Sequence, residues 1–206
     1  MRQGKFYLCL VAFYVLMISF VACSEEKAPG EYDGWEARNE TYLNEIATTA
    51  KTNSDGHWEI LLAYNLGRDT TSYLGQNKYF VYVYKKEIGT GRTPLFTDSV
   101  RVHYEGRLIP SQSYANGLVF DKSYSGDTLN EQTDVPSLMN TGGAITGFAT
   151  ALLHMKEGDR WDVIIPQYLG YKGTAQTKIP AYSTLRFDVK LAKVYRLGID
   201  NNTDWR

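Results

Sequence analysis

The stretch SVRVHYEGRL, residues 99–108, has the alternating pattern of a β-strand with two different faces. Its side chains fall into two sets: Val100, Val102 and Tyr104 on one face, and Arg101, His103 and Glu105 on the other. The polar row suggests acid/base chemistry, but solvated side chains on a strand explain it more simply. We therefore expect Tyr104 to face the protein interior and His103 to face solvent.

Other stretches repeat this pattern and indicate the fold class. DRWDVIIP (159–166) and STLRFDVKLAKV (183–194) alternate apolar and charged residues, and NKYFVYVYKKEIGTG (77–91) predicts a further strand. Strands with one apolar and one polar face predict an antiparallel sheet. TGFATALLHM (146–155) has apolar residues at helical spacing and predicts one short helix. The sequence thus predicts an α+β fold, while HWEILLAYNLG (57–67) fits a strand or a helix equally well.

The N-terminal residues are typical of a targeting segment. Residues 1–22 combine Arg2 and Lys5 with an uncharged apolar run, which predicts a lipoprotein signal peptide. The run ends in FVAC, which is similar to a bacterial lipobox and makes Cys23 the candidate lipidation site. A transmembrane anchor is the alternative interpretation of the same run. Residues 23–33 are polar and are expected to be a tether.

Residues 34–78 are expected to form an N-terminal helical extension. The helix is predicted over DGWEARNETYLNEIATTAK, where Asp33 and Glu36 have the spacing of a capping box. Its apolar face contains Leu43, Ile46, Ala47 and Ala50.

Several kinds of chemistry lack support in the sequence. The three histidines are far apart and none has a second ligand at metal spacing, so no metal site is expected. No phosphate-binding loop or serine-nucleophile motif occurs, and no cofactor is expected. A formal net charge of −1 gives no basic face for nucleic acid. An enzyme with this sequence would work without a metal or a nucleophile.

Four blocks in order resemble the FKBP-type peptidyl-prolyl isomerases: VRVHYEGRL, VFDKSY, AITGFATALLHMKEGDRWDVIIPQYLGYKG and IPAYSTLRFDVKLAKV. The resemblance implies an FKBP-like antiparallel half-barrel wrapped around one short helix, as a domain over residues 79–196 followed by a tail, 197–206. It also implies an aromatic pocket between sheet and helix. The residues carried over as catalytic are Tyr104, Asp121 and Tyr171. Those carried over as substrate-binding are Phe120, Ala144, Ile145, Phe148, Ile179 and Phe187.

The resemblance assigns roles within this pocket. Phe148 would form the floor, the Ile145 N–H and the Tyr171 hydroxyl would donate to a ligand carbonyl, and Ala144 would make one wall shallower than usual. Asp121 lacks the arginine that often accompanies the family's aspartate. The segment 109–119, IPSQSYANGLV, is longer than the family's usual turn.

The resemblance implies isomerisation of X–Pro bonds in exported proteins, by non-covalent stabilisation of a twisted amide. The alternative is a peptide-binding or chaperone lipoprotein that uses the same fold without catalysis. The expected partners are proline-containing polypeptides and, through Cys23, a membrane. The expected location is the cell envelope, at the outer membrane, on its periplasmic or its surface face.

Overall fold

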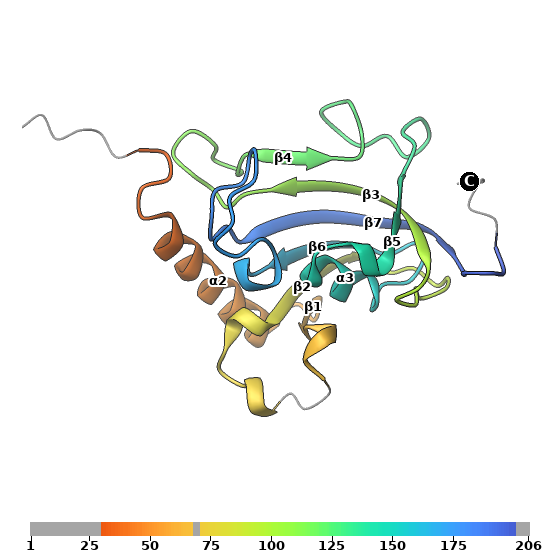
Figure 1. Ribbon diagram of the computed structural model, residues 1–206, viewed down its shortest axis with the longest axis horizontal. Coiled ribbons are helices and arrows are strands. Elements are labelled where there is room, and N and C mark those ends of the chain that lie inside the picture. Colours follow the sequence, from red (N-terminus) through yellow and green to blue (C-terminus); the bar gives the residue numbers. More distant parts are fainter. Residues whose placement is uncertain (1–29, 68–70, 201–206) are drawn as a thin grey trace, which may run out of the picture. The chain divides into compact units, whose positions relative to one another are not determined.

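A seven-stranded antiparallel sheet organises the chain, as seen in the computed structural model (Figure 1). The structure describes residues 30–67 and 71–200, and all of these from residue 31 onward belong to one compact unit. The predicted signal peptide, the lipidation site at Cys23 and most of the tether lie outside the described residues. Among the described residues, no helix is both long enough and apolar enough to cross a membrane.

Every pair of neighbouring strands in the sheet is antiparallel. Their order across the sheet is β1-β2-β6-β7-β3-β4, and β5 also pairs with β3. The strands are β1 (Trp58–Leu62), β2 (Phe80–Glu87), β3 (Ser99–Arg107), β4 (Val119–Lys122), β5 (Ser137–Asn140), β6 (Arg160–Ile165) and β7 (Leu185–Tyr195). The helices are α2 (Trp35–Thr52) and α3 (Thr146–Leu152), with short 3-10 turns η2 (Tyr64–Leu66), η3 (Thr71–Tyr73), η4 (Asn77–Tyr79), η5 (Thr141–Gly143) and η6 (Gln167–Leu169).

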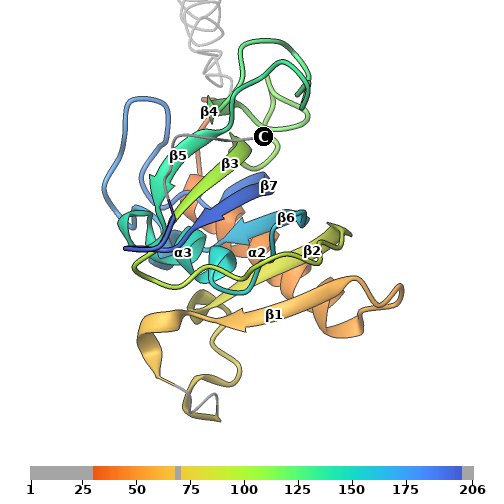
Figure 2. The same ribbon diagram turned by 90° about the vertical axis from the view of Figure 1, so that its right-hand side faces the viewer.

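The two helices lie on opposite faces of the sheet (Figure 2). On the inner face, α3 packs Phe148 and Leu152 into the main core with the inward residues of β2, β3, β6 and β7. On the outer face, Leu43 and Ala47 of α2 pack against Tyr82. The predicted α+β class, with an antiparallel sheet around a short helix and an N-terminal helical extension, is confirmed.

Two expectations about local structure need correction, and the alternative that the sequence left open for residues 57–67 is resolved. The outer face of the sheet was expected to be exposed to solvent, but α2 and neighbouring segments cover part of it. His103 was expected to face solvent, but it is only 3% exposed. The predicted capping box at Asp33 does not begin the helix, since the N-cap is Gly34 in a left-handed conformation, with φ 61°. The open segment 57–67 contains both a strand, β1, and a 3-10 turn, η2.

Candidate active site

A cavity of about 600 Å³ opens between the inner face of the sheet and α3. It is lined mainly by aromatic and apolar side chains: Tyr104, Phe120, Asp121, Met139, Asn140, Gly143, Ala144, Ile145, Phe148, Tyr171 and Phe187. Large, mostly apolar cavities with a few polar groups are typical of ligand sites. All but one of the residues that the sequence predicted for the site line this cavity.

Four aromatic rings build the cavity's apolar interior. Phe187 of β7 is at the centre, with ring centroids 5.0 Å from Phe148 of α3 and 5.4 Å from Phe120 of β4. The ring of Tyr104 lies 6.2 Å from Phe148 and 6.4 Å from Phe187. All four contacts are edge-to-face, the arrangement that aromatic quadrupoles favour. The rings therefore fix one another's orientation before any ligand enters.

Gly106 makes room for this aromatic cluster. In the β3 register it lies opposite Asp121 of β4 and Phe187 of β7. A Cβ atom at this position would lie 2.5 Å from the Phe120 ring and 2.8 Å from the Phe187 ring. Only glycine allows both rings to lie against the strand backbone.

One polar pair lies at the edge of the aromatic cluster. The Tyr104 hydroxyl donates a hydrogen bond of 2.8 Å to the Asp121 carboxylate. Burial, together with this bond, raises the pKa of Tyr104 well above its usual range. Tyr104 is therefore a neutral wall residue and its hydroxyl proton is committed to Asp121. This bond also supplies the partner of Asp121, for which the sequence offered no arginine.

Two donors at the cavity are available to a ligand. No described residue hydrogen-bonds to the Tyr171 hydroxyl, and Tyr171 is 36% exposed in the loop between β6 and β7. The backbone N–H of Ile145, the N-cap residue of α3, likewise donates to no group among the described residues. Both donors are on residues that line the cavity, so a carbonyl bound there can accept from them.

Ile179 is the predicted binding residue that the structure places elsewhere. It is 6% exposed and packs in the main core, and it is not among the residues that line the cavity. Sequence reasoning missed Met139, Asn140 and Gly143, which line the cavity from β5 and η5. These residues could not be predicted, because the four residues of β5 show no clear alternation and η5 is a short turn without periodicity.

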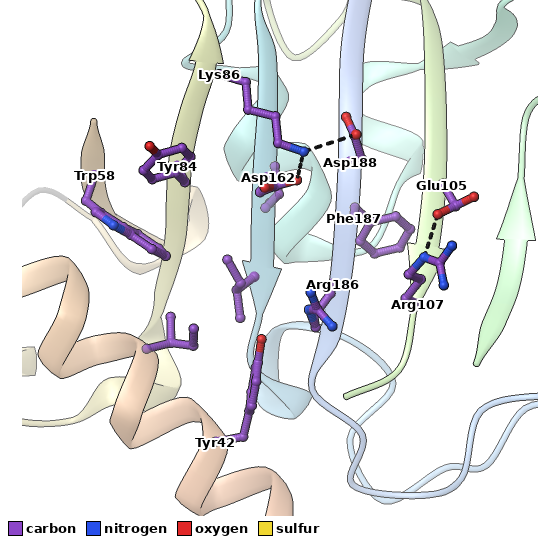
Figure 3. Close-up of a pocket in the computed structure, with 13 residues that line it drawn as sticks. Tyr42, Trp58, Tyr84, Lys86, Glu105, Arg107, Asp162, Arg186, Phe187 and Asp188 are labelled. Atoms are coloured by element: carbon purple, nitrogen blue, oxygen red, sulfur yellow. Dashed lines mark hydrogen bonds and ion pairs between the residues drawn. The ribbon is translucent and has the colours of Figure 1, made fainter. Parts of the chain in front are cut away.

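The outer face of the sheet has a cavity of different character (Figure 3). It measures about 480 Å³ and lies between α2 and the strands. Lys86 bridges Asp162 and Asp188, and Arg107 pairs with Glu105. An apolar ring bound here would remove water from these ion pairs, which is unfavourable in free energy. The inner cavity is therefore the better site for an apolar ligand.

The inner cavity thus combines an aromatic surface with two donors, the Ile145 N–H and the Tyr171 hydroxyl, that have no partner among the described residues. The family model of FKBP-type peptidyl-prolyl cis-trans isomerase matches residues 91–192, which contain all the lining residues of this site. The chain belongs to this family.

Two sequence relatives illustrate the range of similarity. The FKBP-type 22 kDa peptidyl-prolyl cis-trans isomerase of Escherichia coli is 39% identical over 107 residues, which are 52% of this chain and 46% of that protein. The macrophage infectivity potentiator of Trypanosoma cruzi is 28% identical over 192 residues, which are 91% of this chain and 84% of that protein. The match thus spans under half of the Escherichia coli relative.

Solved structures agree on the fold. The crystal structure of FkpA from Escherichia coli gives a TM-score of 0.55 at 24% identity, covering 94% of this chain and 73% of that one. The crystal structure of a peptidyl-prolyl cis-trans isomerase from Pseudomonas syringae gives a TM-score of 0.55 at 20% identity, covering 82% of this chain and 100% of that chain.

Proposed function

We propose that this chain catalyses cis-trans isomerisation of X–Pro bonds in polypeptides. The observation that carries the proposal is the aromatic cavity with two uncommitted donors, within a domain of the matching family. A proline ring is compact and apolar, and the four-ring interior offers it a dry surface. Carbonyl groups of the bound peptide would accept hydrogen bonds from the Ile145 N–H and the Tyr171 hydroxyl, which would hold the peptide in place.

The physical basis of catalysis is preferential binding of the twisted amide. An X–Pro bond is held planar by its partial double-bond character, with a barrier of about 18–20 kcal/mol. Twisting removes the resonance, and the amide becomes less polar. A dry aromatic cavity disfavours the polar planar form more than the twisted form, so it lowers the barrier. The aromatic contacts hold the cavity in shape, so little reorganisation is needed at the moment of reaction.

The direct test is the isomerisation rate of a short X–Pro peptide with the full chain purified in mild detergent. Phe148→Ala should lower kcat/KM at least about tenfold, since it removes the buried floor of the cavity. Tyr171→Phe should lower kcat/KM by roughly fivefold to tenfold, since it removes one hydrogen bond and leaves the ring. Tyr168→Phe, an exposed hydroxyl outside the cavity, is the matched control and should retain the wild-type rate. Peptide binding without any rate above background would instead support the non-catalytic alternative.

We further propose that the chain is a lipoprotein of the cell envelope, anchored through Cys23 at the outer membrane, and that its substrates are exported polypeptides. The support is the sequence of residues 1–22, with its basic start, apolar run and FVAC ending. Mass spectrometry of the purified chain should find acyl groups on Cys23, and Cys23→Ser should move the protein from the membrane fraction to the soluble fraction. An unmodified Cys23 in membrane-bound protein would contradict this anchoring.

A further inference from the structure

The loop between β6 and β7, residues 166–184, carries the Tyr171 donor and is anchored by the N-terminal helix α2. Two hydrogen bonds cross between them. The Trp35 indole N–H donates to Ser183 Oγ at 2.8 Å, and the Thr184 backbone N–H donates to Asn39 Oδ1 at 2.7 Å. These bonds join residues more than 140 positions apart in the chain. In Figure 1 this loop lies beside the N-terminal part of α2.

The groups that make these contacts are buried. Asn39 is 1% exposed, Thr184 1%, Ser183 4% and Trp35 6%. The side chains of this network also make further hydrogen bonds: Asn39 Nδ2 donates to the Trp35 carbonyl, and Ser183 Oγ donates to the Pro180 carbonyl. Breaking one member would leave a buried polar group unpaired, which is costly. The network therefore holds the end of the loop firmly against α2.

The loop itself has a backbone conformation that needs such support. Lys172 and Tyr182, neither of them glycine, have positive φ angles of 57° and 61°. They are joined by a hydrogen bond of 2.7 Å from the Tyr182 N–H to the Lys172 carbonyl. Residues other than glycine keep this left-handed backbone conformation only when the surrounding structure holds them in it. Lys172 follows Tyr171 directly, so the anchored end of the loop is connected to the donor by one backbone hydrogen bond.

We propose that Asn39 and Trp35 of α2 are positioning residues for the isomerase site, acting through the 166–184 loop on Tyr171. Neither residue lines the cavity. Both lie outside residues 91–192, the part that matches the family model, so this support comes from the N-terminal extension. The proposal rests on the proposed isomerase function for its effect on rate. Its structural part, the order of the loop, stands independently of catalysis.

The first experiment measures loop order by amide hydrogen exchange in the full chain. Asn39→Ala should accelerate exchange of the Tyr182 N–H about fivefold or more, because the Thr184 N–H loses its acceptor and the loop opens more often. Asn44→Ala is the matched control, since it removes an asparagine from the same helix that contacts Asn77 and not the loop. Unchanged exchange at Tyr182 in Asn39→Ala would overturn the proposal.

The second experiment measures kcat/KM for a short X–Pro peptide. Asn39→Ala should lower it about fivefold, and the loss should largely disappear in a Tyr171→Phe background, because the two changes act through the same donor. An equal loss in both backgrounds would show a general structural effect and overturn the role assigned to Tyr171. Trp35→Phe removes the indole donor and leaves a smaller aromatic ring in the core, so it tests the same point if Asn39→Ala unfolds. A wild-type chain without isomerase activity would refute the proposed function, while the exchange measurement would still decide the anchoring of the loop.

Discussion

Gly106→Ala should damage the aromatic cluster by adding a single methyl group. The new Cβ would lie 2.5 Å from the Phe120 ring and 2.8 Å from the Phe187 ring, whereas carbon atoms pack comfortably at about 3.5–4.0 Å. At least one ring must therefore move by about 1 Å. Overpacking of this kind costs about 1–3 kcal/mol, and the lower entropy of unfolded alanine offsets about 0.4–1 kcal/mol of it. We expect the free energy of unfolding to fall by about 1–2 kcal/mol.

The same displacement should affect activity, because both rings line the cavity. A shift of about 1 Å in a positioned site can cost as much as 100-fold, and we expect kcat/KM to fall at least about tenfold. Urea unfolding and the X–Pro peptide assay measure the two effects. Gly126→Ala is the matched control, since the nearest atom to its Cβ is the Thr128 carbonyl oxygen at 3.5 Å. Wild-type stability and activity in Gly106→Ala would refute this account of the cluster, and Phe120→Leu added to Gly106→Ala should recover part of the stability.

The remaining predictions concern buried polar groups. Burial lowers the pKa of His103, so the unfolded state binds more protons in mild acid; the stability due to this group is complete above about pH 6.5 and is lost as pH falls below it. Urea unfolding at pH 7 and pH 5.5 measures this effect. The free energy of unfolding should fall less between the two pH values in His103→Leu than in the wild type, and equal falls would contradict the assignment. Asp159 is 3% exposed and accepts hydrogen bonds of 2.6 Å from the Gly89 and Lys156 N–H groups, so Asp159→Ala should lower the free energy of unfolding by about 1–3 kcal/mol; no change in the urea midpoint would argue against that role. Tyr104→Phe keeps the ring and loses only the hydrogen bond to Asp121. It should lower the free energy of unfolding, measured in urea, by about 0.5–1.5 kcal/mol, and a larger loss would mean that the ring has moved.

The strands and the inner face were predictable because their side chains alternate. In β7 the apolar residues of the alternating pattern are Leu185, Phe187, Val189 and Leu191, and all four are buried. The same argument put Tyr104 on the inner face, whereas the aromatic pocket and its residues were implied by the resemblance to the FKBP-type family. Periodicity reports which residues share a face, and that was sufficient for these positions.

The outer face was less predictable, because polarity alone does not reveal what covers a strand. His103 reads as a solvated residue from its position between Val102 and Tyr104, yet it is buried. Its cover comes from segments distant in sequence, such as the one containing Leu129. The same reason hid the contact of Asn39 with Thr184, since nothing local in either sequence indicates the other. Long-range polar pairing has no periodic signature.

The alternation along β7 also explains how one sheet can hold two cavities of opposite character. Phe187 points to the inner face and lies at the centre of the aromatic cluster, while its neighbours Arg186 and Asp188 line the outer cavity. Asp188 there accepts two hydrogen bonds of 2.9 Å from Arg160, so its charge is neutralised on the outer side. The aromatic cavity is therefore separated from these charges by the thickness of the sheet, although charged residues alternate with its walls along the same strand.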